Sequence, residues 1–202
     1  MIGIINANSG NLGSLINALN FLNIKCKIIN EYSEIDDFKK IILPGVGSFS
    51  HLKKNLLSLN LYEALKKFIE NDKNYFLGIC VGMQILLTKG TEDGQIDGFN
   101  FFKGEVINFN NFKKIKTPNI NWLNIECKHS SEILKNVENE KFYFLHSFVC
   151  KLEDPNFILA TSTYQGIEFP CVIKKNNVFG AQFHPEKSRT QGLTILKNFS
   201  NL

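Results

Sequence analysis

The chain has 202 residues, the size of one domain, and its 44% hydrophobic and 21% charged residues are ordinary for a folded globular protein. Aromatic residues make up 12% of the chain, which is enough apolar material for a core and excludes disorder as the main state. The net charge is +4, but Arg189 is the single arginine, so the charge gives little support to nucleic-acid binding.

Membrane, export and disulfide signals are weak in this sequence. No apolar run reaches the ~18 residues of a membrane span, and the N-terminus lacks the basic region and cleavage site of a signal peptide. The five cysteines are scattered without a Cys-x-x-Cys pair, so we expect neither a disulfide framework nor a metal site. We therefore expect a cytoplasmic protein that binds neither nucleic acid nor membranes, with one cysteine as a candidate nucleophile.

In the first 90 residues, short apolar segments alternate with segments of helical periodicity. The pattern predicts strands at 2–6, 26–29, 40–43 and 75–79. It predicts helices at 11–22, 56–69 and 82–87. This alternation is typical of an α/β protein with an open, mostly parallel central sheet flanked by helices.

The second half of the chain is rich in predicted strands. These lie at 101–109, 122–127, 142–149, 157–163, 168–173 and 178–183, and a closing helix is predicted at 190–199. No linker or repeat separates the two halves. We therefore expect residues 1–202 to form a single domain, with a β-rich second half added to the α/β core.

The strongest local signal is the predicted strand that runs into Gly78-Ile79-Cys80-Val81-Gly82 and then into a helix. This is the arrangement of a nucleophile elbow, with a thiol in place of the usual serine. Glycines beside the nucleophile permit the close packing of a sharp turn. The following helix N-terminus favours a thiolate and can bind an oxyanion. The alternative is a buried structural cysteine in a glycine-flanked turn.

A nucleophilic thiol needs a base, and the base needs a group that orients it. His184 follows a predicted strand and is itself followed by Pro185 and Glu186. Residues two apart in an extended segment project to the same side, so Glu186 is predicted to support the imidazole. A lone histidine is more often structural, but this position downstream of a cysteine elbow favours catalysis.

A third segment, Pro44-Gly45-Val46-Gly47, follows the predicted strand 40–43. Sites in open parallel sheets assemble at the carboxyl ends of the strands, so we expect this loop beside the elbow. Its backbone N–H groups could then supply a second oxyanion donor. It is not a phosphate loop, because the required Gly-Lys-Ser/Thr is missing.

These segments together resemble the class I (triad) glutamine amidotransferases. The motifs that carry the resemblance are Gly10-Asn11-Leu12, Leu43-Pro44-Gly45-Val46-Gly47, Gly78-Ile79-Cys80-Val81-Gly82-Met83-Gln84, Phe142-Tyr143-Phe144-Leu145-His146-Ser147 and Gln182-Phe183-His184-Pro185-Glu186-Lys187-Ser188. They extend over essentially the whole chain. Within this family the sequence is similar to the glutaminase subunits of imidazole glycerol phosphate synthases.

The resemblance implies a role for each matching position. Cys80 would be the nucleophile, His184 the base and Glu186 the orienting acid. The implied oxyanion donors are Val46, Gly47 and Val81. The implied glutamine-binding residues are Gly47, Gln84, Glu92 (facing the substrate ammonium), Ser147 and Phe148, with His146 in the pocket wall. The implied partner interface contains Lys187, Pro118 and Trp122.

The activity implied by the resemblance is hydrolysis of L-glutamine to glutamate and ammonia. It requires no cofactor or metal. The ammonia would pass to a (β/α)8-barrel synthase subunit in a heterodimer that makes imidazole glycerol phosphate and aminoimidazole carboxamide ribotide in histidine biosynthesis. Glutaminase activity would be weak until that partner binds its own substrate.

Three segments depart from the family pattern. Asn6-Ala7-Asn8 stands in place of Asp-Tyr-Gly, Asn121 and Leu123 in place of Gly and Asn around Trp122, and Phe148 in place of Tyr. The triad is untouched, so the departures concern the partner. A paralogous glutaminase subunit that feeds a sugar-modifying amidotransferase is therefore the alternative. A stand-alone cysteine hydrolase and a catalytically silent binding subunit are further alternatives.

Overall fold

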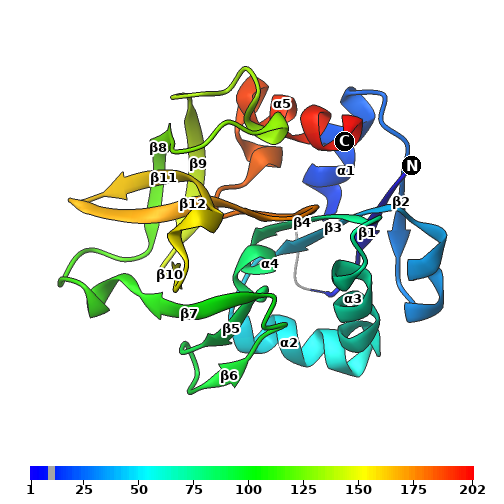
Figure 1. Ribbon diagram of the computed structural model, residues 1–202, viewed down its shortest axis with the longest axis horizontal. Helices are drawn as coiled ribbons and strands as arrows, with labels where there is room; N and C mark the ends of the chain where they lie inside the picture. Colours follow the sequence, from blue (N-terminus) through cyan, green and yellow to red (C-terminus); the bar gives the residue numbers. More distant parts are fainter. Residues whose placement is uncertain (9–11) are drawn as a thin grey trace.

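A nine-stranded mixed sheet runs through the centre of the computed structural model, which describes residues 1–8 and 12–202 (Figure 1). Its order is β2-β1-β3-β4-β13-β12-β11-β8-β9. The parallel strands are β1 (Ile2–Ile5), β2 (Cys26–Ile29), β3 (Lys40–Gly45), β4 (Tyr75–Cys80) and β13 (Val178–Ala181). The antiparallel continuation is β12 (Ile167–Lys175), β11 (Ile158–Tyr164), β8 (Asn119–Cys127) and β9 (Lys141–His146). The predicted α/β sheet with a β-rich second half is confirmed.

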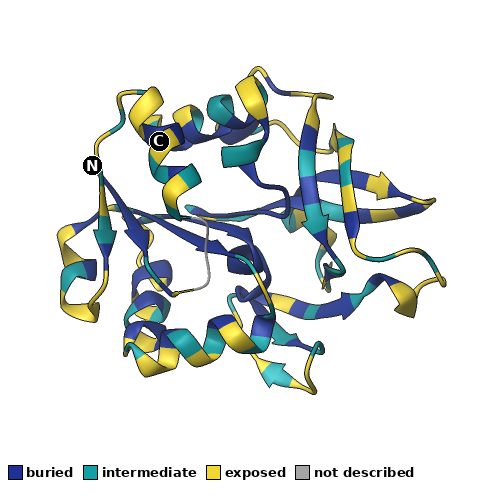
Figure 2. Cartoon of the chain, turned by 180° about the vertical axis from the view of Figure 1, so that it is seen from behind, coloured by how far each residue is buried: buried dark blue, intermediate teal, exposed yellow. Residues whose placement is uncertain are grey.

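Helices cover both faces of the parallel part of the sheet (Figure 1). On one face lie α1 (Leu12–Phe21) and α5 (Arg189–Asn201), and on the other α2 (Phe49–Ser58), α3 (Leu61–Glu70) and the short α4 (Val81–Gln84). Strands β1, β4 and β13 are almost wholly buried, whereas the helices expose their outer sides (Figure 2). Of the motif predicted at 10–12, Gly10 and Asn11 lie outside the described residues.

A second, four-stranded sheet packs beside the first in the order β10-β7-β5-β6. Its strands are β10 (Phe148–Leu152), β7 (Phe102–Asn108), β5 (Leu87–Gly90) and β6 (Ile96–Asp97). The single strand predicted at 142–149 is wrong, because the chain leaves one sheet and enters the other at Ser147. His146 pairs with Asn119 of β8, whereas Phe148 pairs with Asn108 of β7.

The helix predicted at 56–69 is also wrong, because α2 and α3 are separate helices. Asn60 lies between them with φ 57° and ψ 18°, the left-handed region that ends an α-helix. The apolar residues on either side keep a nearly continuous helical spacing, so periodicity alone does not reveal the break. The helix predicted at 82–87 stops at Gln84, because the chain then enters β5 in the second sheet.

Replacing Asn60 by alanine should destabilise the fold by about 1 kcal/mol, because alanine adopts positive φ less readily than asparagine does. The Asn60 side chain makes no capping hydrogen bond, so the effect should come from the preference for positive φ and not from a lost helix cap. Urea unfolding measures the change. Asn60→Gly is the matched control and should show no loss; equal losses in both variants would contradict the backbone explanation.

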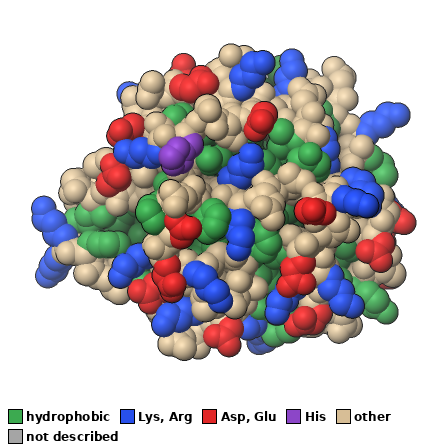
Figure 3. Space-filling model, in the orientation of Figure 1, with side chains coloured by type: hydrophobic (Ala, Val, Ile, Leu, Met, Phe, Trp, Pro, Cys, Tyr) green, Lys and Arg blue, Asp and Glu red, His purple; other side chains and the backbone are tan. Residues whose placement is uncertain are grey.

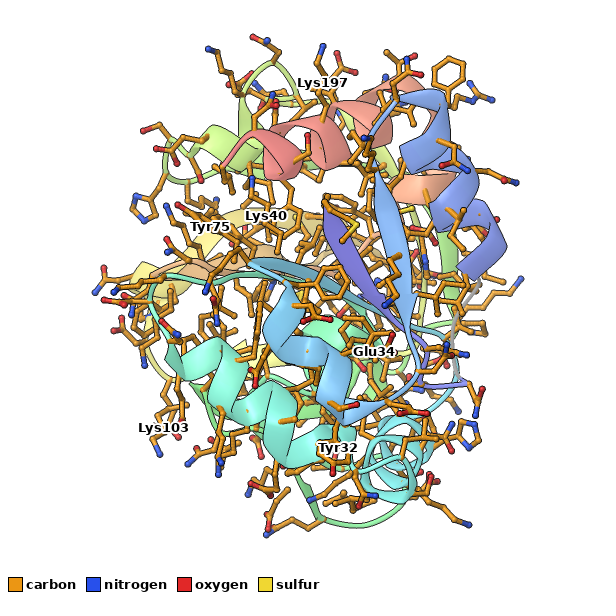
Figure 4. All side chains as sticks on the ribbon, turned by 90° about the vertical axis from the view of Figure 1, so that its right-hand side faces the viewer. Tyr32, Glu34, Lys40, Tyr75, Lys103 and Lys197 are labelled. Carbon is orange, nitrogen blue, oxygen red and sulfur yellow. The ribbon has the colours of Figure 1, made fainter. Side chains whose placement is uncertain are left out.

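Polar contacts connect the parallel strands to neighbouring elements; Figure 4 labels three of the side chains involved, Lys40, Tyr75 and Glu34. Lys40 Nζ donates to the Ser200 carbonyl oxygen at 2.6 Å and lies 5.6 Å from the Tyr75 ring centroid, which ties β3 to the end of α5. Glu34, in the 3-10 helix Tyr32–Asp37, pairs with Lys27 of β2 at 2.7 Å. The hydrogen bond from Lys27, helped by two backbone N–H groups, lowers the pKa of Glu34 to about 2.

The surface carries both signs of charge. On the face in Figure 3, Lys and Arg side chains are interspersed with Asp and Glu. Within residues 1–8 and 12–202, every helix is too short or too polar to cross a membrane. All five cysteines are free thiols; Cys150 and Cys171 are buried, whereas Cys26 and Cys127 are only half-buried.

Candidate active site

Cys80 lies at the carboxyl end of β4, at the turn into α4. Its backbone has φ 54° and ψ −109°, a conformation that costs a non-glycine residue roughly 1–3 kcal/mol and is typical of functional turns. A Cβ at Gly82 would overlap the Leu43 carbonyl oxygen, and one at Gly78 would overlap the Gly82 carbonyl oxygen. The predicted elbow is therefore present, and its glycines are required by the close approach of three backbone segments.

His184 and Glu186 meet as predicted, but by a different local geometry. His184 Nδ1 lies 2.9 Å from Glu186 Oε1, and both side chains are almost fully buried. The intervening backbone is not extended, because Pro185–Lys187 forms a 3-10 helix. The backbone N–H of His184 donates to the Tyr143 carbonyl oxygen at 3.0 Å, which fixes the histidine against β9.

The electrostatics of the site favour a protonated His184. Burial alone would lower the pKa of this imidazole, but the neighbouring Cys80 and the carboxylate of Glu186 outweigh it and raise the pKa to about 10. Its Nε2 is buried and makes no close hydrogen bond within the described part of the chain. Nε2 is thus the atom that can exchange a proton with the sulfur or a substrate.

Glu186→Gln should lower the turnover number by roughly 10²-fold, within the range of general acid–base effects. The amide removes the carboxylate that helps to raise the pKa of His184, so less imidazolium remains at neutral pH. Steady-state kinetics across pH 6–9 measure the loss. An unchanged turnover number and pH profile would show that Glu186 does not support His184.

A cavity of about 220 Å³ opens beside Cys80 and His184. It is smaller than the ≈300–1,000 Å³ of a pocket for a drug-sized ligand and suits an amino acid. Its lining residues are Val46, Gly47, Cys80, Val81, Gln84, Glu92, Pro118, Leu145, His146, Ser147, Phe148 and His184. The cavity thus brings together every predicted oxyanion and glutamine-binding residue.

The predicted interface residues are divided between the cavity and the surface. Pro118 lines the cavity itself, whereas Lys187 and Trp122 do not. Trp122 is 38% exposed and lies under Arg189, whose Cζ is 5.0 Å from the indole. Ile120, two residues earlier on β8 and on the same face, is also exposed. This exposed apolar surface of β8 lies next to the strand that supplies the cavity wall.

Glu92 supplies a carboxylate to the cavity. Its Oε2 accepts the backbone N–H of Phe49 at 2.9 Å, which anchors it to the start of α2. Burial raises the pKa of Glu92, an effect that this hydrogen bond partly offsets. A cationic group entering the cavity would relieve the burial penalty of the charged carboxylate.

His146 lies in the cavity wall, the position that the family resemblance implies, and its surroundings favour the neutral imidazole. Its Nδ1 lies 2.9 Å from the Phe148 carbonyl oxygen and its Nε2 3.2 Å from Asn119 Nδ2. Because a carbonyl only accepts, Nδ1 carries the proton and Nε2 accepts. Burial lowers the pKa of His146 to about 3; the bond to Phe148 opposes this shift and nearby His184 adds to it.

Acid should destabilise the protein in part through His146. The unfolded chain binds a proton near the ordinary pKa of 6.5, whereas the folded chain does so only near 3. The contribution of neutral His146 to the free energy of unfolding is fully present above pH 6.5. It falls by up to ~1.4 kcal/mol per pH unit as the pH is lowered towards 3. Between pH 7 and pH 5, the free energy of unfolding of His146→Phe, measured in urea, should therefore fall by about 2 kcal/mol less than that of the unmodified protein. Equal decreases in the two proteins would contradict the low pKa of His146 in the folded state.

Two groups around the sulfur were not expected from the sequence. The Leu145 carbonyl oxygen lies 3.8 Å from Cys80 Sγ, and Gln182 Nε2 lies 3.7 Å from it. The sequence feature that could have indicated Gln182 as a site residue is its position two residues before His184, at the end of a predicted strand. Among the described residues, no group of three or more His, Cys, Asp or Glu side chains is arranged to hold a metal ion.

Solved structures with the same fold match this chain at low sequence identity. A crystal structure of a glutamine amidotransferase superposes with a TM-score of 0.74 at 17% identity, covering 100% of this chain and 99% of that one. A chain of PurLQS from Thermotoga maritima gives a TM-score of 0.76 at 18% identity, covering 99% of this chain and 97% of that one. At these identities the likeness establishes the fold alone.

Sequence relatives are closer and match over their whole length. Imidazole glycerol phosphate synthase subunit HisH of Caldanaerobacter subterraneus subsp. tengcongensis is 42% identical over 100% of this chain and 98% of its own length. The proteins of the same name from Leptospira borgpetersenii and Bdellovibrio bacteriovorus are 37% and 38% identical over 100% of both chains. The family model for class I glutamine amidotransferases matches residues 4–201. The chain therefore belongs to the class I glutamine amidotransferase family.

Proposed function

We propose that this chain is the glutaminase subunit of an imidazole glycerol phosphate synthase in histidine biosynthesis. The observation that carries the proposal is the cavity in which Cys80 and His184 meet Gln84 and Glu92. A thiol and a raised-pKa imidazole beside a half-buried carboxylate suit a substrate with an amide at one end and an ammonium at the other. The full-length relatives named HisH support the same assignment.

The reaction begins when the Cys80 thiolate attacks the side-chain carbonyl carbon of glutamine. A C–S bond forms, and the electrons of the C=O double bond move to the oxygen. Backbone N–H groups of Val46, Gly47 and Val81, which all line the cavity, are proposed to hold this oxyanion. The positive φ of Gly47, 100°, gives its loop a conformation that favours glycine.

Collapse of the tetrahedral intermediate breaks the C–N bond. The departing nitrogen takes the proton from Nε2 of His184 and leaves as ammonia, with a thioester at Cys80. The neutral imidazole then accepts a proton from water, whose oxygen attacks the thioester carbon and breaks the C–S bond. Glutamate leaves, and the thiolate and imidazolium are restored. Glu186 holds Nδ1 throughout and keeps Nε2 towards the reacting atoms.

The ammonia would go to a (β/α)8-barrel synthase subunit as heterodimer partner. Free ammonia is protonated in water near neutral pH, so direct transfer preserves the nucleophile. The exposed Ile120 and Trp122 on β8, with Arg189 and Lys187 nearby, are proposed to lie in the interface. The sequence-based expectation of a cytoplasmic location is part of the same proposal.

The alternatives have less support. Relatives at 36–42% identity carry the synthase-subunit name, which favours it over a sugar-modifying paralogue. A hydrolase acting alone on peptides or esters has no need for a small pocket with the Glu92 carboxylate in its lining. The intact hydrogen-bonded His184–Glu186 pair disfavours a silent binding subunit.

Transfer of labelled nitrogen tests the proposal. The chain is incubated with [amide-15N]glutamine, a (β/α)8-barrel imidazole glycerol phosphate synthase subunit and that subunit's ribotide substrate. We expect 15N in the imidazole product and glutamate formation that rises strongly with the ribotide. Glutamate formation with all 15N released as ammonium would overturn the assignment of this synthase as the partner. Absence of glutamate, with or without the partner, would overturn the assignment of glutaminase activity.

A further inference from the structure

Between the cavity and β8 lies a chain of buried amide and imidazole groups that the reaction steps above leave without a role. It contains Asn119, His146, Gln84 and Gln182, which are 0%, 6%, 3% and 0% exposed. Buried polar side chains are costly to fold unless they are hydrogen-bonded. This set is connected from end to end and finishes at the sulfur of Cys80.

The links are short and consecutive. Asn121 Nδ2 donates to Asn119 Oδ1 at 2.9 Å, and Asn119 Nδ2 lies 3.2 Å from His146 Nε2. His146 Nδ1 and Gln84 Nε2 both donate to the Phe148 carbonyl oxygen, at 2.9 and 3.0 Å. Gln84 Nε2 also donates to Gln182 Oε1 at 3.2 Å, and Gln182 Nε2 lies 3.7 Å from Cys80 Sγ.

The chemistry of the groups allows this network only one direction. The Phe148 carbonyl has no hydrogen to donate, so Gln84 must turn its NH₂ group towards it. The second Nε2 hydrogen of Gln84 then requires an acceptor, which is Gln182 Oε1. With its oxygen so fixed, Gln182 presents its NH₂ group to the sulfur. The reverse orientation would set two NH₂ groups against each other and an oxygen against the sulfur.

We propose that Gln182 is a further catalytic residue, whose fixed amide N–H donates to Cys80 Sγ and stabilises the thiolate that attacks the substrate. The Leu145 carbonyl, on the same sulfur at 3.8 Å, can accept from a thiol and disfavours a thiolate. The donor from Gln182 opposes that preference. Its hydrogen bond to a charged sulfur is stronger than one to a neutral thiol, so it favours ionisation.

Gln84 is a positioning residue in this scheme. It acts through Gln182 by setting which end of its amide faces the sulfur. Because both Nε2 hydrogens of Gln84 are used, its Oε1 is the atom left to face a ligand in the cavity.

Alkylation of Cys80 by iodoacetamide across pH 5–10 tests the proposal, with the modified peptide quantified by mass spectrometry. In Gln182→Met the midpoint of the pH dependence of Cys80 alkylation should rise by about one pH unit. This shift corresponds to a roughly tenfold smaller thiolate fraction at pH values below the midpoint. His184 and the buried Cys150, the other titratable groups that interact with the sulfur, are the same in both proteins. An unchanged midpoint would overturn the proposal.

A matched control removes a different buried polar group, from β11 of the central sheet. Thr161 is 5% exposed, and its hydroxyl makes no hydrogen bond within the described residues. Thr161→Val should leave the Cys80 midpoint where it is. A shift equal to that of Gln182→Met would mean that general loosening of the sheet moves the midpoint, and would overturn the specific role of Gln182.

A measurement on the unmodified protein covers the case in which Gln182→Met does not fold. The side-chain NH₂ resonance of Gln182 in a 15N spectrum should titrate with the same midpoint as Cys80 alkylation, and a resonance that does not titrate would overturn the contact. The inference deepens the proposed function, but neither measurement uses glutamine. Failure of the donor role is therefore distinguishable from failure of the glutaminase.

Discussion

Cys80→Ala should reduce glutamine hydrolysis by on the order of 10⁴-fold or more, because Cys80 supplies the one thiol among the described residues that line the cavity. The remaining residues still bind glutamine, so the loss should fall on the turnover number and leave KM little changed. Glutamate release measured in the reconstituted complex gives both constants.

The same variant should keep its fold and its partner. Cys80 is 3% exposed and the change removes one sulfur atom from the cavity wall, so unfolding stability should change by only about 1 kcal/mol. Association with the barrel subunit, followed by size-exclusion chromatography, should persist. Residual hydrolysis near the unmodified rate would show that another group attacks the substrate.

Gly78→Ala should destabilise the protein by more than ~4 kcal/mol, enough to prevent folding in a domain of ordinary stability. The added methyl group would overlap the Gly82 carbonyl oxygen and approach the Met83 backbone nitrogen to 2.8 Å, so β4 and α4 cannot keep their contact. Backbone atoms at both positions leave no flexible side chain to move aside. Thermal or urea unfolding of the purified variant measures the effect.

Gly180→Ala is the matched control for this prediction. Gly180 pairs in register with Gly78 on the neighbouring strand, but its added methyl group would meet the side chains of Met83 and Ile173. Side chains can shift, so the cost should stay within the roughly 1–3 kcal/mol of an overpacked core. Equal losses at the two positions would show that close backbone packing is not what requires glycine at the elbow.

The sequence predicts the site better than it predicts the elements around it. Cys80 and His184 each follow a short apolar strand, and adjacent parallel strands bring their carboxyl ends together. In the structure β4 pairs with β3 on one side and β13 on the other, so the loop Val46–Gly47, the elbow and His184 meet at one edge. Topology therefore makes the meeting of these segments predictable.

Other features depend on packing that periodicity does not encode. The segment 142–149 has one continuous strand pattern, yet it divides between two sheets at Ser147 because separate partners pair with each half. The contact between Gln182 and the sulfur needs the direction of an amide group, which only its neighbours decide. Neither result follows from the residue types of the segment alone.

The heavy use of asparagine has a structural role that composition does not reveal. Asn8, Asn23, Asn60, Asn100, Asn136, Asn139 and Asn176 all have positive φ. Asparagine tolerates the left-handed region because its short side chain hydrogen-bonds locally. Asn8, which replaces the glycine of the family's Asp-Tyr-Gly segment, keeps φ at 50°. At this departure from the family pattern, asparagine is a residue that tolerates the positive φ of the position.

Labelling with an electrophilic glutamine analogue, a diazoketone in place of the amide, most directly tests whether Cys80 attacks glutamine in this cavity. Mass spectrometry of the intact protein and its peptides should find a single adduct on Cys80, which excess L-glutamine prevents. Cys26 and Cys127, the two half-buried thiols, should stay unmodified. An adduct on either of them, or one on Cys80 that glutamine does not prevent, would contradict a glutamine site built around this thiol.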